Sequence, residues 1–469
     1  MTQQHRWLRA GGAVATVAIA GLVVSGCAGG AAPAASPSAA AVACDPDADV
    51  TITVGERPTA DQAANLEAWQ NAVAAFEKAH PNITIDDEET KYDVTTFPAL
   101  LVGGTLPTTL QVPFTDIQSL IERGQAADIT AYVEDDDVLS QLNPQLAAVT
   151  QDADGHTFGV VRAAYTMGLI YDRALFEEAG LDPDAPPATW DEVLDAAATV
   201  TEETGQTGFI IPTTANTGGW LLTSMSYSNG DLVEEVDGDT TTVTLDTPGM
   251  EASLQFLHDV RWEKDAAGAN YLYDNNAVRD DLAAGVIGQS LNGANLYNSL
   301  VIGRGMPKED FGLAPFPVGD DPAGVLGGGN IQWYNPKATP DQLCAALEWT
   351  KFYFLDRYVD EEAATTWAEA QVADDLPVGL PEVPVVSEEQ YDTYLGWIEP
   401  YINVPRENYT AYLDSLANAT IVPEPAKKAQ ELYAALDPVV QAVLTREDAD
   451  FTQLLKAAQT QVQDLVDAG

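Results

Sequence analysis

The stretch VTITVGERPTADQAANLEAWQNAVAAFEKAHPNITI, residues 50 to 85, decides how the chain begins to fold. It opens with a β-branched run of strand length, followed by the breaker-rich GERPTADQ. Apolar side chains then recur at spacings of three and four: Leu66, Trp69, Val73 and Phe76. This spacing gives a helix one apolar face. Pro81 ends the helix and NITI resumes as a strand, so the order strand, helix, strand predicts an α/β fold with a parallel sheet and covering helices.

The alternation of strand and helix patterns continues towards the C-terminus. A β-rich stretch is expected at 156–172, and helical patterns occupy 190–204, 248–262, 426–443 and 451–467. Another helix should begin in TPDQLCAALEWTKFYF. Its first two residues, Thr339 and Pro340, suit the N-cap and the first helical position, where no backbone donor is needed. We therefore expect sheets flanked by helices in more than one domain.

The charge balance excludes one class of partner. The chain has 21 Lys+Arg against 72 Asp+Glu, a formal net charge of -51. Such a field repels a phosphate backbone, and non-specific nucleic-acid binding depends on the basic residues that are scarce here, so we expect no nucleic-acid partner. The hydrophobic share of 46% favours globular packing over disorder.

The N-terminal segment has the features of a targeting signal. After His5, Arg6 and Arg9, the run 10–24 carries no charge. It is shorter than the roughly 20 apolar residues that a membrane span requires, so residues 1–26 are interpreted as a signal peptide. VSGC, ending at Cys27, looks like a bacterial lipobox. That likeness implies a diacylglycerol on Cys27; the alternative is a buried cysteine in a core helix.

A tether should follow the anchor. Residues 28–43 contain only Ala, Gly, Pro, Ser and Val, which cannot bury enough surface to become ordered. We therefore interpret 27–44 as a flexible tether on the extracytoplasmic face of the cell membrane.

The cysteines leave a second question open. With Cys27 lipidated, Cys44 and Cys344 remain, and an even pair outside the cytoplasm is a candidate disulfide; a core thiol at Cys344 is the alternative. The histidines at 80, 156 and 258 have no metal-ligand spacing, so we expect neither a metal nor a cofactor.

Five stretches together resemble one family. They are AWQNAVAAFEKAHPNITI (68–85), GLIYDRALFEEAGLDPDAPPATWDEVLDAA (168–197), SNGDL (228–232), DFGLAPFPVG (310–319) and VLGGGNIQWY (325–334). The chain resembles the extracellular solute-binding lipoproteins of ABC importers, in the sugar-binding, maltose-binding-protein-like group. The second stretch is the most specific of the five.

The resemblance implies a periplasmic-binding-protein-like fold (type II), in which two lobes, each a mixed sheet flanked by helices, are joined by hinge strands. Crossings are expected near 160–166, near 325–332 and within 376–386. The first lobe would comprise 45–162 plus 327–385, and the second 163–326 plus 386–469. Cys44 and Cys344 would then lie in the same lobe, which favours the disulfide.

A sugar site needs aromatic platforms and planar hydrogen-bonding groups. The resemblance places Asp116, Tyr165 and Trp220 in such a site, as hydroxyl acceptor, polar contact and stacking ring. Asp116 could instead cap the following helix, and Trp220 could be a core residue. Arg57 is either a hydroxyl donor in the cleft or a salt-bridge partner.

Three amides complete the candidate set. Relatives often carry Gly-Pro-Trp where this chain has Gly293-Ala294-Asn295. The lost ring makes Asn292 and Asn295 candidate amide contacts. Asn330 in GGGN faces the cleft or serves a turn. Trp333 and Arg406 are weaker candidates.

Three functions fit the sequence. The first is capture of a sugar, an oligosaccharide or glycoside, and its delivery to ABC permease subunits by a monomeric protein that catalyses no reaction. No G-x-S-x-G, H-E-x-x-H or Walker A motif is present. The second is an anchored glycoside hydrolase that uses two carboxylates. The third is a ligand-sensing receptor of the same fold.

Overall fold

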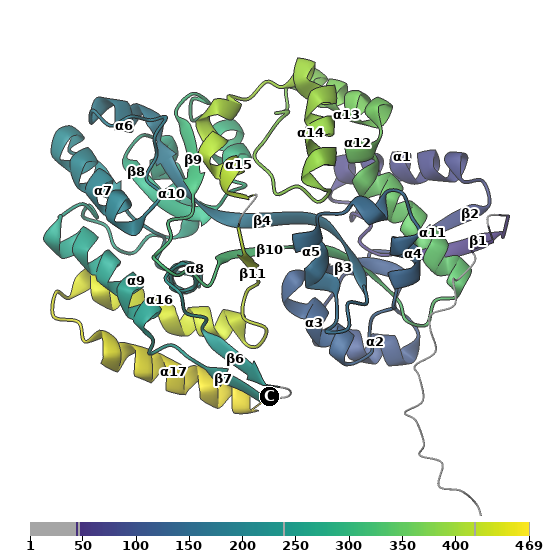
Figure 1. The fold of residues 1–469 in the computed structure, drawn as a ribbon, viewed down its shortest axis with the longest axis horizontal. Helices are drawn as coiled ribbons and strands as arrows, with labels where there is room; N and C mark the ends of the chain where they lie inside the picture. The colour runs from purple at the N-terminus through teal and green to yellow at the C-terminus, as the bar shows by residue number, and fades with distance from the viewer. Residues whose placement is uncertain (1–43, 46, 238–239, 417–418, 469) are drawn as a thin grey trace, which may run out of the picture. The chain divides into compact units, whose positions relative to one another are not determined.

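The computed structural model describes residues 44, 45, 47–237, 240–416 and 419–468 (Figure 1). The predicted signal peptide, Cys27 and residues 28–43 of the tether lie outside these residues. Among the described helices, none combines the length and the apolar character that a membrane span needs.

The strands alternate with helices along the chain, as the α/β prediction requires. The strands are β1 (Val50–Val54), β2 (Ile83–Asp87), β3 (Thr109–Pro113), β4 (Gly159–Asp172), β5 (Thr207–Phe209), β6 (Glu234–Asp237), β7 (Thr240–Val243), β8 (Ile287–Gly293), β9 (Phe311–Pro315), β10 (Val325–Tyr334) and β11 (Ile421–Val422). One sheet of the described residues runs in the order β2-β1-β3-β10-β4-β8-β5, with β9 paired to β4 and β11 to β10. Strands β6 and β7 form a separate antiparallel pair.

The helices lie close to the predicted positions. They are α1 (Ala63–Ala79), α2 (Phe97–Gly103), α3 (Phe114–Glu122), α4 (Thr130–Glu134), α5 (Pro144–Ala147), α6 (Arg173–Glu178), α7 (Trp190–Thr204), α8 (Thr217–Ser228), α9 (Pro248–His258), α10 (Asn275–Ala283), α11 (Pro340–Thr350), α12 (Asp356–Val359), α13 (Glu361–Ala373), α14 (Glu388–Ile398), α15 (Thr410–Leu416), α16 (Ala429–Thr445) and α17 (Phe451–Ala468). The expected cap of α11 is confirmed, because the Thr339 side chain accepts from the backbone N–H of Gln342 with Pro340 in the first turn.

The opening strand, helix, strand unit is confirmed. Strands β1 and β2 pair in parallel from Val50 with Ile83 to Val54 with Asp87, and α1 connects them. The helix buries Trp69 and Phe76. These rings join a first core, built by β1 to β3, the start of β4, the end of β10 and helices α1 to α3 and α11 to α14.

A second core collects the middle and the end of the chain. It contains buried residues of β5, β8, β9, α6 to α10 and α15 to α17. Helix α7 follows the predicted bounds, and a capping box formed by Thr189 and Glu192 fixes its start. Strands β4 and β10 contribute to both cores: β4 changes core between Val161 and Met167, and β10 between Leu326 and Ile331. In Figure 1 these two strands run side by side through the middle of the view.

The chain passes from the first core to the second for the last time at a later position than the expected boundary at residue 385. The buried side chains of α14, which are Tyr391, Tyr394 and Ile398, pack in the first core, and the second core resumes at Val404. The physical reason is that α14 lies against α12 and α13 and extends the apolar surface that they offer. The first core therefore continues about a dozen residues further than the Pro-rich segment 376–386 indicated.

Cys44 and Cys344 form a disulfide in the structure. Their Cα atoms are 6.0 Å apart, within the range that a disulfide spans. Cys344 lies on α11, which packs beside β1, and Cys44 lies a short distance in sequence before β1 begins at Val50. The bond therefore fastens the beginning of the folded chain to the first core.

Candidate functional site

The predicted ligand residues lie at the carboxyl ends of parallel strands and on the two strands shared by the cores. Arg57 follows β1, Asp116 follows β3, and Asn292 is the last residue but one of β8. Ligands of open α/β sheets bind outside the carboxyl ends of the strands. Tyr165 lies on β4, Asn330 on β10 and Asn295 in the turn after β8, so six of the seven candidates lie near strand ends or on a shared strand. The seventh, Trp220, lies on helix α8.

Arg57 forms ion pairs. Its guanidinium contacts the Asp87 carboxylate at 3.3 Å and the Glu89 carboxylate at 3.2 Å. Of the two roles that the sequence left open, the structure favours the salt-bridge partner. These partly exposed pairs orient the loop after β1 and contribute little to stability.

Asp116 is not the cap of the helix that follows β3. Helix α3 begins at Phe114 with Pro113 as its N-cap, so Asp116 lies in the first turn. Burial raises the pKa of the Asp116 carboxyl, and hydrogen bonds from Tyr92 and Thr115 partly offset that rise. The carboxylate therefore faces the Tyr92 hydroxyl at the end of the sheet.

An Arg-centred network crosses the sheet beside these residues. The Arg162 guanidinium donates to both carboxylate oxygens of Glu56, at 2.9 and 3.2 Å, and to the Gln332 side chain at 2.9 Å. It also contacts Gln111 and lies 4.4 Å from the ring centroid of Phe354. The sequence did not single out Arg162, although it lies within the expected crossing at 160–166.

Asn330 belongs to the same network. Its side-chain oxygen accepts from the Gln111 amide at 2.6 Å. A register shift between Asn330 and Ile331 in the β10–β4 ladder re-aims the strand at this position. Gln111 therefore links Asn330 to Arg162. Asn330 has this structural contact within the sheet in addition to any contact with a ligand.

Asn292 and Asn295 differ in accessibility. Asn292 is buried; its amide donates to Asn275 at 2.9 Å and its oxygen accepts from the Gly293 N–H at 3.0 Å, so both ends of the side chain have protein partners. Asn295 is exposed. A Cβ at Gly293 would lie 3.1 Å from the Asn295 oxygen and 3.8 Å from the Tyr165 ring, so both side chains lie close to Gly293.

Tyr165 and Trp220 meet at a carboxylate that the sequence did not identify. Tyr165 of β4 and Trp220 of α8 are both half-buried and both interact with Glu424. Burial raises the pKa of the Glu424 carboxyl, and the neighbouring Trp220 and Tyr165 side chains partly offset the rise. The Trp220 indole N–H is buried without a hydrogen-bond partner in the described structure, so it lies near the carboxylate but does not complete a hydrogen bond to it. Trp220 also packs against the second core, so its two predicted roles, ring platform and core residue, are combined. The only sequence signal for Glu424 was its place between two prolines.

The weaker candidates lie elsewhere. Trp333 is fully buried and donates to the Gln125 carbonyl at 2.8 Å, which makes it a core residue. Arg406 donates to the Gly379 carbonyl at 3.0 Å and lines a cavity of about 960 Å³ between α5, α14 and α15. None of the seven predicted ligand residues lines that cavity.

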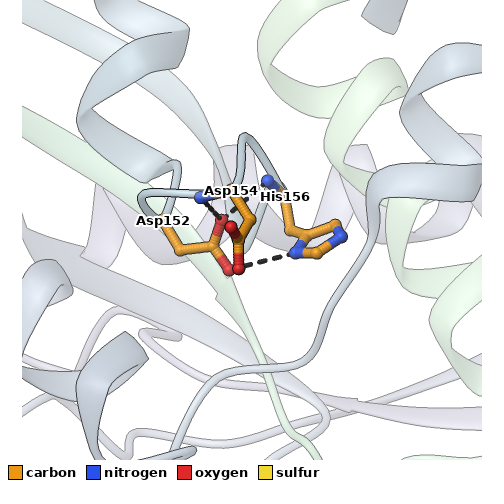
Figure 2. Close-up of side chains that lie close together, drawn as sticks. All are labelled: Asp152, Asp154 and His156. Atoms are coloured by element: carbon orange, nitrogen blue, oxygen red, sulfur yellow. Dashed lines mark hydrogen bonds and ion pairs between the residues drawn. The ribbon is translucent and has the colours of Figure 1, made fainter. Parts of the chain in front are cut away.

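Three side chains in a surface loop could hold a cation by their donor types. Figure 2 shows Asp152, Asp154 and His156 with their ligand atoms gathered together. One Asp152 oxygen already accepts from the backbone N–H groups of Asp154 and His156, both at 2.9 Å, and the other contacts the His156 ring at 3.1 Å. The hydrogen bond to Asp152 raises the pKa of His156. These contacts explain why the three side chains lie together: they stabilise the loop.

Comparison with known proteins identifies relatives and the fold. A sequence model of the family described as bacterial extracellular solute-binding protein matches residues 59–360. A binding protein of Brucella abortus (strain 2308) is 26% identical over 301 residues, covering 61% of this chain and 67% of that protein. Among solved structures, the cyclic alpha-maltosyl-1,6-maltose binding protein of Arthrobacter globiformis is similar, with a TM-score of 0.65 at 22% identity, covering 90% of this chain and 100% of that chain. The sugar-binding protein MalE of Xanthomonas citri has a TM-score of 0.67 at 16% identity, covering 89% and 98%. These likenesses confirm the predicted two-lobed, periplasmic-binding-protein-like fold.

Proposed function

Because the chain belongs to the family of bacterial extracellular solute-binding proteins, we propose that it captures a sugar between its lobes and delivers it to the membrane permease of an ABC importer. The single observation that carries this proposal is the meeting of two half-buried aromatic side chains, Tyr165 and Trp220, at the Glu424 carboxylate. Aromatic faces pack on the C–H surfaces of a sugar, while carboxylates and amides accept from its hydroxyls.

The two cores support capture by hinge closure. Strands β4 and β10 belong to both cores, and the chain returns once more between Ile398 and Val404. A few backbone positions in such strands can absorb the rotation of one lobe against the other. The lobes of this proposal are 45–162 plus 327 to about 400, and 163–326 plus the remainder.

Within the site we assign Tyr165 and Trp220 as platforms, and Asp116, Asn295 and Asn330 as hydrogen-bonding groups. Arg57 and Asn292 already bond protein partners, and we assign them a structural role beside the site. The protein binds its ligand without altering it.

We further propose that residues 1–26 are removed as a signal peptide and that Cys27 carries a lipid, with 27–44 as the tether. Metabolic labelling with a radioactive fatty acid tests this anchoring: the wild-type chain should be labelled and the variant Cys27→Ala should not.

A thermal-shift panel of sugars and polyols tests the capture of ligand. A specific ligand in excess raises the melting temperature in proportion to RT ln(1 + [L]/Kd), and it must be recovered unchanged. Hydrolysis products in the same wells would instead support the glycoside hydrolase, and no shift with any sugar would contradict sugar binding. Small-angle scattering with the shifting ligand should show compaction, as hinge closure requires.

A further inference from the structure

The position of Glu424 follows from strand register. Strand β11 pairs in parallel with β10, with Val325 opposite Ile421 and Leu326 opposite Val422. Extending this register by two residues beyond β11 puts Glu424 level with Gly328, which pairs with Tyr165 on the other side of β10. Gly328 has no side chain to separate them, so the Tyr165 hydroxyl and the Glu424 carboxylate lie next to each other across a glycine.

The Glu424 carboxylate has aromatic neighbours and lacks a cation. Its interacting groups are the Trp220 indole and the Tyr165 hydroxyl. Among the described residues, no Lys, Arg or His contributes to the pKa shift of this carboxyl. Pro423 and Pro425 flank it and restrict the backbone that carries it. Burial without a cation disfavours the charged form of this carboxyl, and a cationic partner would stabilise that form.

A second observation concerns the buried hydroxyl of Tyr433. Tyr433 of α16 is 1% exposed and its hydroxyl has no hydrogen-bond partner in the described structure. Burial raises the pKa of that hydroxyl most, and the charge of Glu424 is the next largest cause, followed by Tyr227 and Tyr165. Buried hydroxyls rarely stay unpaired. The Tyr433 hydroxyl therefore offers a free acceptor and donor beside the same carboxylate.

We propose that the ligand carries a positively charged amino group, which pairs with Glu424 between the rings of Tyr165 and Trp220. An ammonium group is attracted by the faces of Tyr and Trp and by a carboxylate at once. It also has enough N–H donors to reach the Tyr433 hydroxyl. This inference rests on the proposed function for the location of the ligand, and it narrows the ligand class to an amino sugar or a similar small amine.

The experiment follows the indole N–H signal of Trp220 by NMR in the full-length folded protein. Trp220→Phe assigns that signal among the nine tryptophans. The probes are methylammonium chloride against sodium chloride, and glucosamine in its protonated form against glucose. Methylammonium and glucosamine should shift the Trp220 signal saturably, and glucose should require at least about tenfold higher concentration.

The variant Glu424→Gln keeps the size of the side chain and removes its charge. It should weaken the methylammonium and glucosamine responses by about tenfold or more. Glu431→Gln, an exposed acid of α16 with the same change of net charge, should leave them unaltered. Should Glu424→Gln fail to fold, Glu424→Asp withdraws the carboxylate by one methylene and should weaken both probes.

Equal effects of methylammonium and sodium, or an undiminished response in a folded Glu424 variant, would overturn the inference. If neutral sugars raise the melting temperature and methylammonium gives no response, the proposal of sugar binding stands and the proposal of an amine-bearing ligand is rejected. An ammonium response without a shift from any sugar would support the amine and reject the sugar.

Discussion

Gly328 of β10 stands opposite Tyr165 of β4, and a Cβ atom at Gly328 would lie 2.8 Å from the Tyr165 hydroxyl oxygen. The absence of a side chain at this position sets where the Tyr165 ring lies. Because the ring is also the neighbour of Glu424, this glycine governs the candidate site without contacting a ligand.

Gly328→Ala should therefore displace the Tyr165 ring. We expect ligand affinity to fall about tenfold, and stability to fall by roughly 1–3 kcal/mol, the usual cost of overpacking. Calorimetric titration and thermal unfolding measure the two effects. Gly396→Ala in α14 is the matched control, since its Cβ would meet nothing within 4 Å and an exposed helical Gly→Ala change adds about 0.5–1 kcal/mol. Unchanged affinity in Gly328→Ala would remove Tyr165 from the site.

Trp220→Ala should weaken ligand binding at least about tenfold, because it removes the larger of the two rings. Trp220 also packs against the second core, so a lower melting temperature is expected as well. Trp220→Phe separates the effects, since it keeps an aromatic face and most of the packing. Titration of both variants with the ligand found in the panel is the measurement; equal affinity of Trp220→Ala and wild type would contradict the stacking role.

Asp172 should make the fold less stable as the pH rises. It is 4% exposed, and its carboxylate caps α6 by accepting from the Leu175 N–H at 3.0 Å. Burial, with a smaller contribution from the charge of Asp310, raises the pKa of Asp172 to about 6. The folded state therefore holds a proton that the unfolded chain has released between about pH 4 and pH 6, so this group lowers the free energy of unfolding across that window.

Asp172→Asn tests that pH dependence, since Asn caps helices as well as Asp does. The variant should match wild type near pH 4 and exceed it by ~1–3 kcal/mol at neutral pH. Urea unfolding of both proteins across the pH range gives the difference between their free energies of unfolding. The other carboxylates are common to both proteins, so their contributions cancel in this difference. A constant difference at all pH values would show that Asp172 does not titrate as described.

The disulfide should stabilise the first core by about 2–5 kcal/mol. It joins residues 300 apart in sequence and fastens the start of β1 to α11. Wild-type protein should unfold at a lower temperature in the presence of a reductant. The double variant Cys44→Ser and Cys344→Ser should unfold at that lower temperature with or without reductant; a reductant effect that persists in the double variant would have another cause.

Arg162→Ala should destabilise the protein by roughly 2–4 kcal/mol, because it leaves the Glu56 carboxylate without its cation in a mostly buried place. Glu56→Gln alone should cost less, and the pair Arg162→Ala with Glu56→Gln should recover part of the loss. A double-mutant cycle measured by urea unfolding gives the coupling energy. Strictly additive effects would show that the bidentate contact carries no stability.

The sequence by itself determined the fold class and most of the elements. Alternating β-branched runs and helical spacings located β1, α1 and β2, and the capping residue Thr339 marked the first turn of α11. These features are local: side chains within a few positions of one another determine them, so they can be predicted without knowledge of the tertiary fold.

Only the tertiary structure decided which residues meet. Helix α14 was assigned beyond the first lobe because a Pro-rich segment precedes it, yet Tyr391 and Tyr394 pack with the first core. Glu424 lies more than 200 residues from Tyr165 and Trp220 in sequence, and it reaches them because β11 adds to the edge of β10. Contacts of this kind depend on strand order and register, which arise when distant segments bury their apolar faces together, and no local pattern of residues encodes them.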